Sequence, residues 1–238
     1  MKTFPIILIA MIALTGCKYK TGTAATTDDK TTMTAKDTLT YLALGDSYTI
    51  GESIPPEQSF PYQLASSLTA DSVHVGTPTI IATTGWTTDD LLAAITGSNI
   101  HSKTYDLVTV LIGVNDQYEG LTQSNYRVEF KRLLDTAINF AKGDKTRVFV
   151  LSIPDWGVTP YANGQSKKNV SPQIDQFNAI NKDESEKAGT HYLDITPLSR
   201  QIKTDTSLLA ADQLHPSGKM YGLWVNKLAP MVKARLKK

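Results

Sequence analysis

Five short apolar stretches, each followed or preceded by a longer stretch with helical periodicity, constrain the fold of this 238-residue chain most strongly. The apolar stretches are residues 41–44, 79–82, 106–112, 147–153 and 191–195. The helical stretches are residues 58–68, 87–95, 123–140, 172–188 and 217–236, the last interrupted by Pro230. Strands that alternate with helices through short links form a parallel sheet with helices on both faces. We therefore predict a three-layer α/β/α domain around a parallel sheet of about five strands.

The first 16 residues do not belong to this domain. Met1-Lys2 precedes an apolar run from Phe4 to Leu14, which is too short to span a bilayer as a stable helix. The run leads into Leu14-Thr15-Gly16-Cys17, which resembles the bacterial lipobox, where the chain is cut before a cysteine that carries a diacylglycerol. We predict a lipoprotein signal peptide over residues 1–16 and lipidation of Cys17. An ordinary secretory signal followed by an incidental cysteine is the alternative.

Residues 17–38 are rich in Thr, Ala, Asp and Lys and contain almost no large apolar side chains. Such a segment cannot bury enough surface to order itself, so we expect a flexible tether between the lipidated Cys17 and the domain. The remaining residues, 39–238, have the length of one domain. The formal net charge of +1 argues neither for a nucleic-acid-binding surface nor for a binder of acidic polymers, and we expect no nucleic-acid partner. Cys17 is the only cysteine, so neither a disulfide nor a thiolate metal site stabilises the domain.

Four groups of small or reactive residues follow the predicted strands or lie in the loop before the last helix. They are Gly45-Asp46-Ser47, Gly85, Gly113-Val114-Asn115-Asp116 and Asp212-Gln213-Leu214-His215. The carboxyl ends of parallel strands meet at one edge of the sheet, where α/β proteins bind their ligands. We therefore expect the four groups to lie close together. Taken alone, Ser47 has a structural alternative as the N-cap of the segment that follows it.

In this order the four groups resemble the motif blocks of the SGNH family, also called GDSL-type esterases and lipases. The letters S, G, N and H correspond to Ser47, Gly85, Asn115 and His215. The resemblance extends from Tyr41 to Val232 and implies the flavodoxin-like fold and the ester hydrolysis of that family. The segment Gly45-Asp46-Ser47-Tyr48-Thr49 lacks the second glycine of the G-x-S-x-G nucleophile elbow, which argues against an ordinary α/β-hydrolase.

The chemistry of acyl transfer explains why a serine, a histidine and an aspartate occur together. A serine hydroxyl is a weak nucleophile at neutral pH and needs a positioned base, for which a histidine is suited. The histidine needs a carboxylate on its other ring nitrogen to fix its tautomer and orientation. The resemblance implies Ser47 as nucleophile, His215 as base and Asp212, three residues before it, as the carboxylate. Asp194, at the end of the last strand, is the alternative to Asp212.

The attacked carbonyl becomes an oxyanion, which needs fixed hydrogen-bond donors. The resemblance assigns this oxyanion hole to the backbone N–H groups of Ser47 and Gly85 and to the side-chain amide of Asn115. Glycine suits close backbone approach because it has no Cβ, and a neutral amide donates without adding a charge. We expect Asp116 to have a structural or supporting role and Asp46 to orient the serine turn.

Three aromatic side chains, Tyr48, Trp86 and Trp156, are candidates for a substrate pocket; packing in the core or at its rim is the alternative for each. The sequence has no H-E-x-x-H, no cysteine pair and no phosphate-binding G-x-x-x-x-G-K-[ST]. We therefore expect neither a metal nor a cofactor, and acyl transfer to water requires none.

We predict a serine esterase that forms an acyl-enzyme on Ser47. The expected partners are small-molecule, glycan or lipid esters, with a short-acyl ester of the acetyl type or a lysophospholipid as leading substrates. A thioesterase on the same fold and a catalytically silent glycan-binding lipoprotein are the alternatives. We expect a monomer anchored in the bacterial cell envelope. Lys18 in place of an aspartate after Cys17 favours the outer membrane.

Overall fold

The computed structural model describes residues 38–100 and 102–236. The predicted signal peptide (1–16), the lipidation site Cys17 and the predicted tether up to residue 37 lie outside the described residues. No helix in the described part of the chain combines the length and the apolar character needed to cross a membrane.

The described residues build the predicted parallel sheet. Its strands are β1 (Tyr41–Gly45), β2 (Thr79–Ala82), β3 (Leu107–Leu111), β4 (Val148–Leu151) and β5 (His191–Leu193). They pair in parallel in the order β2-β1-β3-β4-β5. Every residue of β1, β3 and β4 is buried, which explains why these strands read as continuous apolar runs. The strand order reverses direction between β1 and β3, and ligands bind at such a point in α/β sheets.

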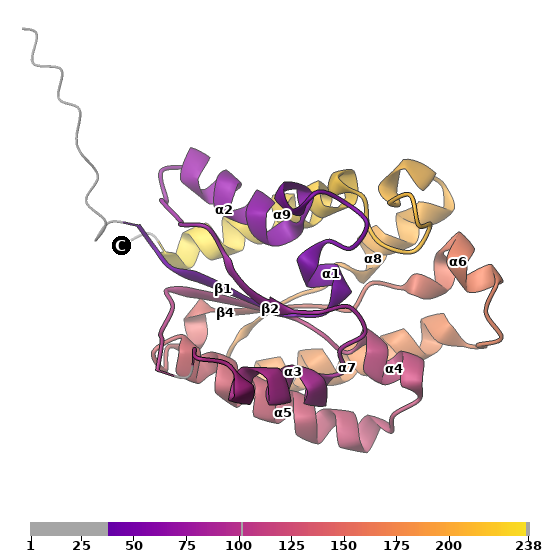
Figure 1. Ribbon diagram of the computed structural model, residues 1–238, viewed down its shortest axis with the longest axis horizontal. Helices are drawn as coiled ribbons and strands as arrows, with labels where there is room; N and C mark the ends of the chain where they lie inside the picture. The colour runs from indigo at the N-terminus through magenta and orange to yellow at the C-terminus, as the bar shows by residue number, and fades with distance from the viewer. Residues whose placement is uncertain (1–37, 101, 237–238) are drawn as a thin grey trace, which may run out of the picture. The chain divides into compact units, whose positions relative to one another are not determined.

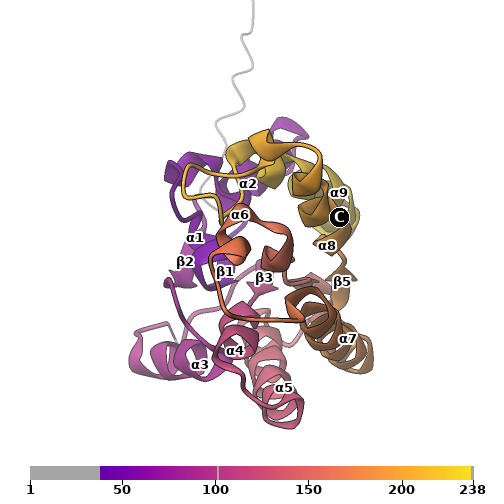
Figure 2. The same ribbon diagram turned by 90° about the vertical axis from the view of Figure 1, so that its right-hand side faces the viewer.

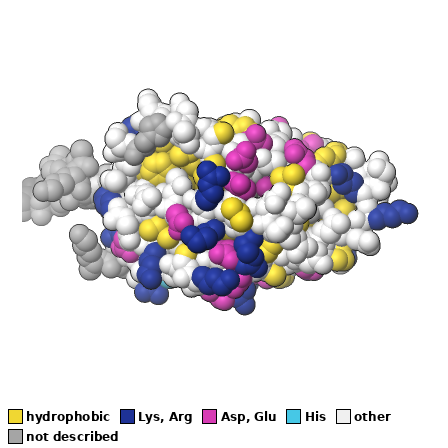
Figure 3. Space-filling model, turned by 90° about the horizontal axis from the view of Figure 1, so that it is seen from below, with side chains coloured by type: hydrophobic (Ala, Val, Ile, Leu, Met, Phe, Trp, Pro, Cys, Tyr) yellow, Lys and Arg dark blue, Asp and Glu magenta, His cyan; other side chains and the backbone are white. Residues whose placement is uncertain are grey.

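Helices cover both faces of the sheet, so the predicted α/β/α layering is confirmed (Figure 1). One face carries α2 (Phe60–Ala70), α9 (Gly218–Leu236) and the short α8 (Thr196–Ser199). The other carries α3 (Thr88–Gly97), α5 (Gln123–Phe140) and α7 (Val170–Ala188). The outer surface of this second layer carries intermixed basic and acidic side chains (Figure 3). Several of them pair: Arg127 of α5 contacts Asp183 and Glu184 of α7.

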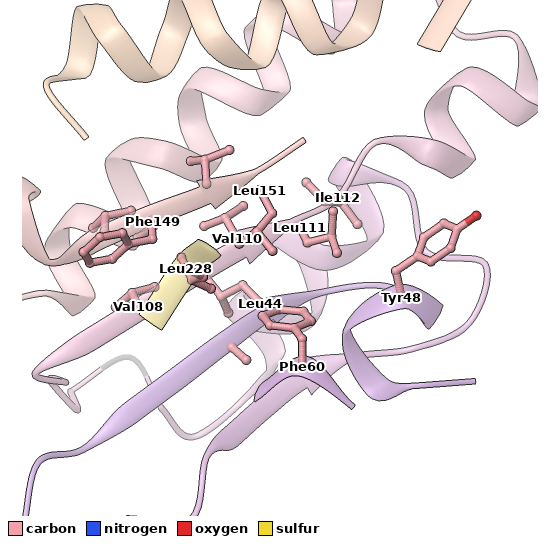
Figure 4. Close-up of a cluster of buried hydrophobic side chains, with 14 of the residues drawn as sticks. Leu44, Tyr48, Phe60, Val108, Val110, Leu111, Ile112, Phe149, Leu151 and Leu228 are labelled. Carbon is pink, nitrogen blue, oxygen red and sulfur yellow. The ribbon is translucent and has the colours of Figure 1, made fainter. Parts of the chain in front are cut away.

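The core lies between the sheet and these two layers. Figure 4 shows part of it, where Leu44, Val110 and Leu151 of three neighbouring strands lie close to Phe60 of α2 and Leu228 of α9. These five side chains are fully buried. This burial packs the strands against the helices of both layers.

The structure differs from the sequence prediction mainly in short elements. The segments expected to be loops contain three short helices, α1 (Ser47–Ile50), α4 (Val114–Glu119) and α6 (Pro160–Asn163). Single-turn 3₁₀ segments occur at Pro56–Gln58, Lys145–Arg147, Trp156–Val158, Arg200–Lys203 and Thr206–Leu208. Outside the five strands, Leu39 and Val75 form an isolated parallel bridge. Helix α9 continues through Pro230, although proline lacks a backbone N–H and disfavours a helix interior; the buried neighbours Leu228, Ala229 and Val232 pack this part of the helix into the core.

Figure 2 looks onto one end of the sheet, where α1, α4 and α6 gather in front of the strands. Each of them follows the carboxyl end of a strand: α1 comes after β1, α4 after β3 and α6 after β4. The predicted site residues lie on α1 and α4, in the segments that follow β2 and β4, and on the loop that precedes α9.

Candidate active site

Ser47 is the first residue of α1, directly after β1. Asp46 precedes it as N-cap, and its Oδ1 accepts a hydrogen bond from the backbone N–H of Tyr48 at 2.9 Å. A Cβ on Gly45 would lie 2.1 Å from Thr49 Oγ1 and 2.3 Å from the Leu111 carbonyl oxygen. Gly45 therefore lets α1 turn tightly over β3, and this turn presents Ser47 at the strand end.

Ser47, His215 and Asp212 form one hydrogen-bonded chain. The Nε2 atom of His215 lies 3.0 Å from Ser47 Oγ, and its Nδ1 atom lies 2.6 Å from Asp212 Oδ2. The His215 ring is buried, and the ring of Tyr48 packs against it at a centroid distance of 5.4 Å. The structure thus brings together three residues that are up to 168 positions apart in the sequence.

The hydrogen bonds of Asp212 fix the roles of the two ring nitrogens. Partial burial would raise the pKa of Asp212, but hydrogen bonds from His215, Leu214 N–H and Ser53 outweigh it and hold the pKa at about 2. An ionised carboxylate only accepts, so Nδ1 of His215 carries the hydrogen and Nε2 accepts from the Ser47 hydroxyl. The alternative carboxylate, Asp194, accepts instead from Ser152 and from the backbone N–H of Thr196, away from His215.

Three residues that line the pocket beside the Ser47 hydroxyl carry N–H groups with a hydrogen left for a ligand. Ser47 begins α1, so its own N–H has no acceptor within the helix. The N–H of Gly85 donates to none of the described residues, and its φ of +84° favours glycine at this position. Asn115 Nδ2 donates to the Trp86 carbonyl at 2.8 Å, which fixes the amide and leaves its second hydrogen for a ligand. Ser47, Gly85 and Asn115 all line one pocket.

Two further carboxyl groups lie buried behind this site. Burial, with a smaller contribution from the nearby Asp116, raises the pKa of Asp46 to about 8 against the opposing hydrogen bond from Tyr48 N–H. Burial also raises the pKa of Asp116 to about 6, although Thr88 donates to it through its N–H and its hydroxyl. Both side chains support neighbouring backbone, Asp46 at the start of α1 and Asp116 at the start of α3, as expected.

The pocket beside Ser47 has a volume of about 170 Å³. Ser47, Thr84, Gly85, Asn115 and His215 form its polar part. The rest of the wall consists of Tyr48, Val114, Tyr118, Trp156, Tyr161 and Leu214. No Asp, Glu, Lys or Arg of the described chain lines it.

The three predicted pocket aromatics have different places. Tyr48 and Trp156 line the pocket, and both are also nearly fully buried. Trp86 does not line it and contributes its carbonyl oxygen to Asn115 instead. Tyr118 and Tyr161 were missed by the sequence analysis. Tyr118 follows Asn115 by three residues on α4, so both lie on the same helix face. A helix predicted over these residues would have placed Tyr118 beside Asn115 in the pocket. Tyr161 lies on α6, within a segment that gave no pattern.

The described residues contain no group of three or more His, Asp or Glu side chains arranged to hold a metal ion. The site itself presents one hydroxyl, one imidazole, one carboxylate and a set of N–H donors.

A comparison with family models places the chain. Residues 43–223 match the model of the GDSL-like lipase/acylhydrolase family, and the match includes all four motif groups. The chain belongs to this family. The activity common to the family makes it a carboxylic ester hydrolase.

Several solved structures of esterases and acylhydrolases share the fold. The psychrotrophic esterase EstA from Pseudoalteromonas sp. superposes with a TM-score of 0.64 at 16% identity, covering 84% of this chain and 100% of that one. The lipase/acylhydrolase from Enterococcus faecalis gives a TM-score of 0.63 at 21% identity, covering 84% and 97%. The acetylxylan esterase Axe2 from Geobacillus stearothermophilus gives 0.63 at 17% identity, covering 82% and 94%. These likenesses confirm the SGNH hydrolase fold. No curated protein matches the sequence.

Proposed function

We propose that this GDSL hydrolase cleaves esters through an acyl-enzyme on Ser47, with His215 as general base and Asp212 as its orienting carboxylate. The hydrogen-bonded chain from Ser47 Oγ through His215 to Asp212 carries this proposal. The three N–H donors beside Ser47 support an oxyanion hole made of Ser47 N, Gly85 N and Asn115 Nδ2.

In the first half-reaction, Ser47 Oγ attacks the ester carbonyl carbon while His215 Nε2 takes the hydroxyl proton. The carbonyl oxygen becomes an oxyanion and accepts hydrogen bonds from the three donors. Asp212 stays ionised and stabilises the imidazolium through Nδ1. The tetrahedral intermediate then breaks its bond to the alcohol oxygen. The alcohol leaves with the proton from Nε2, and the acyl group remains on Ser47.

In the second half-reaction, water replaces the alcohol. His215 Nε2 takes a proton from the water as its oxygen attacks the acyl carbon, and the same donors hold the second oxyanion. Collapse breaks the bond to Ser47 Oγ, which regains the proton from Nε2. The carboxylic acid is released and the resting hydrogen-bonded chain is restored.

The pocket favours a short acyl group. Its volume of about 170 Å³ is well under the roughly 300–1,000 Å³ of pockets that enclose drug-sized ligands. Its wall is aromatic and aliphatic beyond the reactive groups, and it offers no ion pair to a charged acyl chain. We therefore place acetyl-type esters ahead of lysophospholipids among the substrates.

A chromogenic ester series, from acetyl to decanoyl, tests this proposal with the full-length protein and its Ser47→Ala variant. We expect the highest kcat/KM on the shortest chains and loss of activity in the variant. A rate that rises with chain length would favour lipid substrates. Wild-type rates in Ser47→Ala would overturn the acyl-enzyme mechanism. A faster reaction with a thioester of the same acyl group would favour a thioesterase.

We also propose that the enzyme is anchored in the bacterial envelope, preferentially the outer membrane, by lipid on Cys17. The lipobox-like Leu14-Thr15-Gly16-Cys17 supports this. The full-length protein should fractionate with membranes and Cys17→Ser should not. Equal membrane fractions for both proteins would refute the anchor.

A further inference from the structure

The two residues after Gly51, the C-cap of α1, are Glu52 and Ser53, and they contact the site from outside the pocket. Ser53 Oγ donates to Asp212 Oδ2 at 2.7 Å, the same oxygen that lies 2.6 Å from His215 Nδ1. The other carboxylate oxygen, Oδ1, accepts from the backbone N–H groups of Leu214 and His215. Ser53 is therefore the only donor to Asp212 among the described residues that lies outside the loop carrying Asp212 and His215.

The backbone holds Ser53 in place. The N–H groups of Gly51 and Glu52 both donate to the carbonyl oxygen of Ser47 at 3.1 Å. The side chain of Glu52 accepts from the hydroxyl of Thr84, which lines the pocket next to Gly85. Ser53 itself has a φ of +65°, a left-handed conformation that costs free energy for a residue other than glycine.

These contacts close a ring. One path runs from Ser47 Oγ through His215 to Asp212, and the other runs from the Ser47 carbonyl through Glu52 N–H and Ser53 Oγ to the same carboxylate. We propose that Ser53 is a positioning residue, which fixes the Asp212 carboxylate relative to Ser47 so that His215 bridges the two. This proposal rests on the proposed function of Ser47, His215 and Asp212.

The ring has a chemical consequence besides geometry. A hydroxyl that donates to Asp212 Oδ2 draws negative charge away from the oxygen that faces His215. Without this donor, the carboxylate stabilises a protonated His215 more strongly. The acidic limb of the kcat/KM profile should then move to higher pH. Ser53 is exposed, so water partly replaces the lost hydroxyl and the effect on rate is moderate.

Three variants of the full-length protein separate the hydroxyl from the backbone. Ser53→Ala removes the hydroxyl, and Ser53→Gly removes it while relieving the positive φ. Ser72→Ala is the matched control, because Ser72 is also exposed, has the same φ of +65° and lies in the connection between α2 and β2. We expect both Ser53 variants to lose on the order of fivefold in kcat/KM and to show the shifted acidic limb. Ser72→Ala should keep the wild-type rate and profile.

A comparison of thermal stability with rate separates the positioning role of Ser53 from a merely structural one. Ser53→Gly should unfold at a temperature equal to or higher than that of the wild type, yet be as impaired in rate as Ser53→Ala. In an Asp212→Asn background, Ser53→Ala should cost little further activity, because Ser53 acts through Asp212.

Two results would overturn the positioning role. One is a Ser53→Ala profile that matches Ser72→Ala, and the other is a full fivefold loss in the Asp212→Asn background. Ser47→Ala is measured in parallel. If it kept activity, the proposed function itself would fail, whereas an inactive Ser47→Ala beside a normal Ser53→Ala would reject only the role of Ser53.

Discussion

At the scale of single residues, Asp46 shows how the turn that presents Ser47 depends on a buried carboxyl group. Its Oδ1 caps α1, whereas its Oδ2 is buried without a hydrogen-bond partner among the described residues. Burial is the main cause of a pKa of about 8, against 3.8 for an ordinary aspartate. The folded state therefore binds this proton more tightly than the unfolded state does. The contribution of Asp46 to stability falls as pH rises from about 4 to about 8.

Asp46→Asn should remove this pH dependence while keeping the oxygen that caps α1. Between pH 5 and pH 8 the wild type loses the contribution of protonated Asp46, and the variant does not. We therefore expect the free energy of unfolding of the variant, minus that of the wild type, to rise by roughly 1–3 kcal/mol over this range. Urea unfolding at the two pH values measures the difference. If the variant and the wild type differed in free energy of unfolding by the same amount at pH 5 and at pH 8, Asp46 would have the same pKa in the folded and unfolded states.

Asn115 is the one side-chain donor of the proposed oxyanion hole, and the Trp86 carbonyl holds its amide in place. Asn115→Ala should lower kcat by about 10²–10³-fold with little change in KM, since the donor acts on charge that develops in the transition state. Steady-state kinetics on the preferred ester measure this, with the melting temperature as the control for folding. A kcat within threefold of the wild type would remove Asn115 from the oxyanion hole.

The sequence identified the residues of the Ser47–His215–Asp212 chain but not what surrounds them. Ser47 and Asn115 each lie two residues after a glycine that follows an apolar run, and His215 directly precedes Pro216, so the local pattern breaks at all three. Ser53 and Tyr161 have no such marker, because their contacts depend on loops whose path is set by tertiary packing. Trp86 looked like a pocket residue, yet its backbone carbonyl rather than its ring contacts the site.

At the scale of elements, long periodic segments were predictable and single-turn ones were not. The stripe of Tyr126, Phe130, Leu133, Leu134 and Ala137 marks α5, and all five side chains are buried. Helices α1 and α4 span only 4 and 6 residues, too few to show a helical period. Asp46 is the N-cap of α1, and Gly113, at a φ of +116°, is the N-cap of α4. In the sequence, neither residue can be told apart from an ordinary turn residue.

The junction of β1 with α1 should tolerate no side chain at Gly45. An alanine Cβ there would overlap Thr49 Oγ1 and the Leu111 carbonyl, so α1 would move or β1 and β3 would separate. We expect Gly45→Ala to cost about 2–3 kcal/mol of stability and most of the activity. Gly97→Ala, at the end of α3, is the control, because a Cβ there meets nothing within 4 Å. Equal stability of the two variants would contradict this packing account.

At the scale of the whole domain, the pocket is assembled from five separate segments. Ser47 and Tyr48 follow β1, Thr84 and Gly85 follow β2, and the other walls follow β3 and β4 or precede α9. The parallel sheet makes this possible, because it brings all its strand ends to one edge. The strand and helix pattern of the sequence predicted that the site lies at this edge. The size of the pocket also depends on the position of α6, which the sequence did not predict.

Tyr161 of α6 is the most exposed aromatic residue that lines the pocket. A smaller side chain at this position should therefore widen the pocket without disturbing the core. Tyr161→Ala should raise the octanoyl-to-acetyl ratio of kcat/KM by about threefold to tenfold, as a widened pocket admits longer chains. Tyr62→Ala, on α2 and outside this pocket, is the matched control. An unchanged ratio would mean that the acyl chain does not pass Tyr161.

Labelling with a fluorophosphonate probe tests whether Ser47 is an activated nucleophile, because only an activated serine displaces the fluoride and forms a stable phosphonyl ester. We expect the intact mass of the wild-type protein to increase by one phosphonyl group, with the modified peptide containing Ser47, and Ser47→Ala to remain unlabelled. A wild-type protein that hydrolyses esters without labelling, or a Ser47→Ala protein that labels as fast as the wild type, would contradict the account.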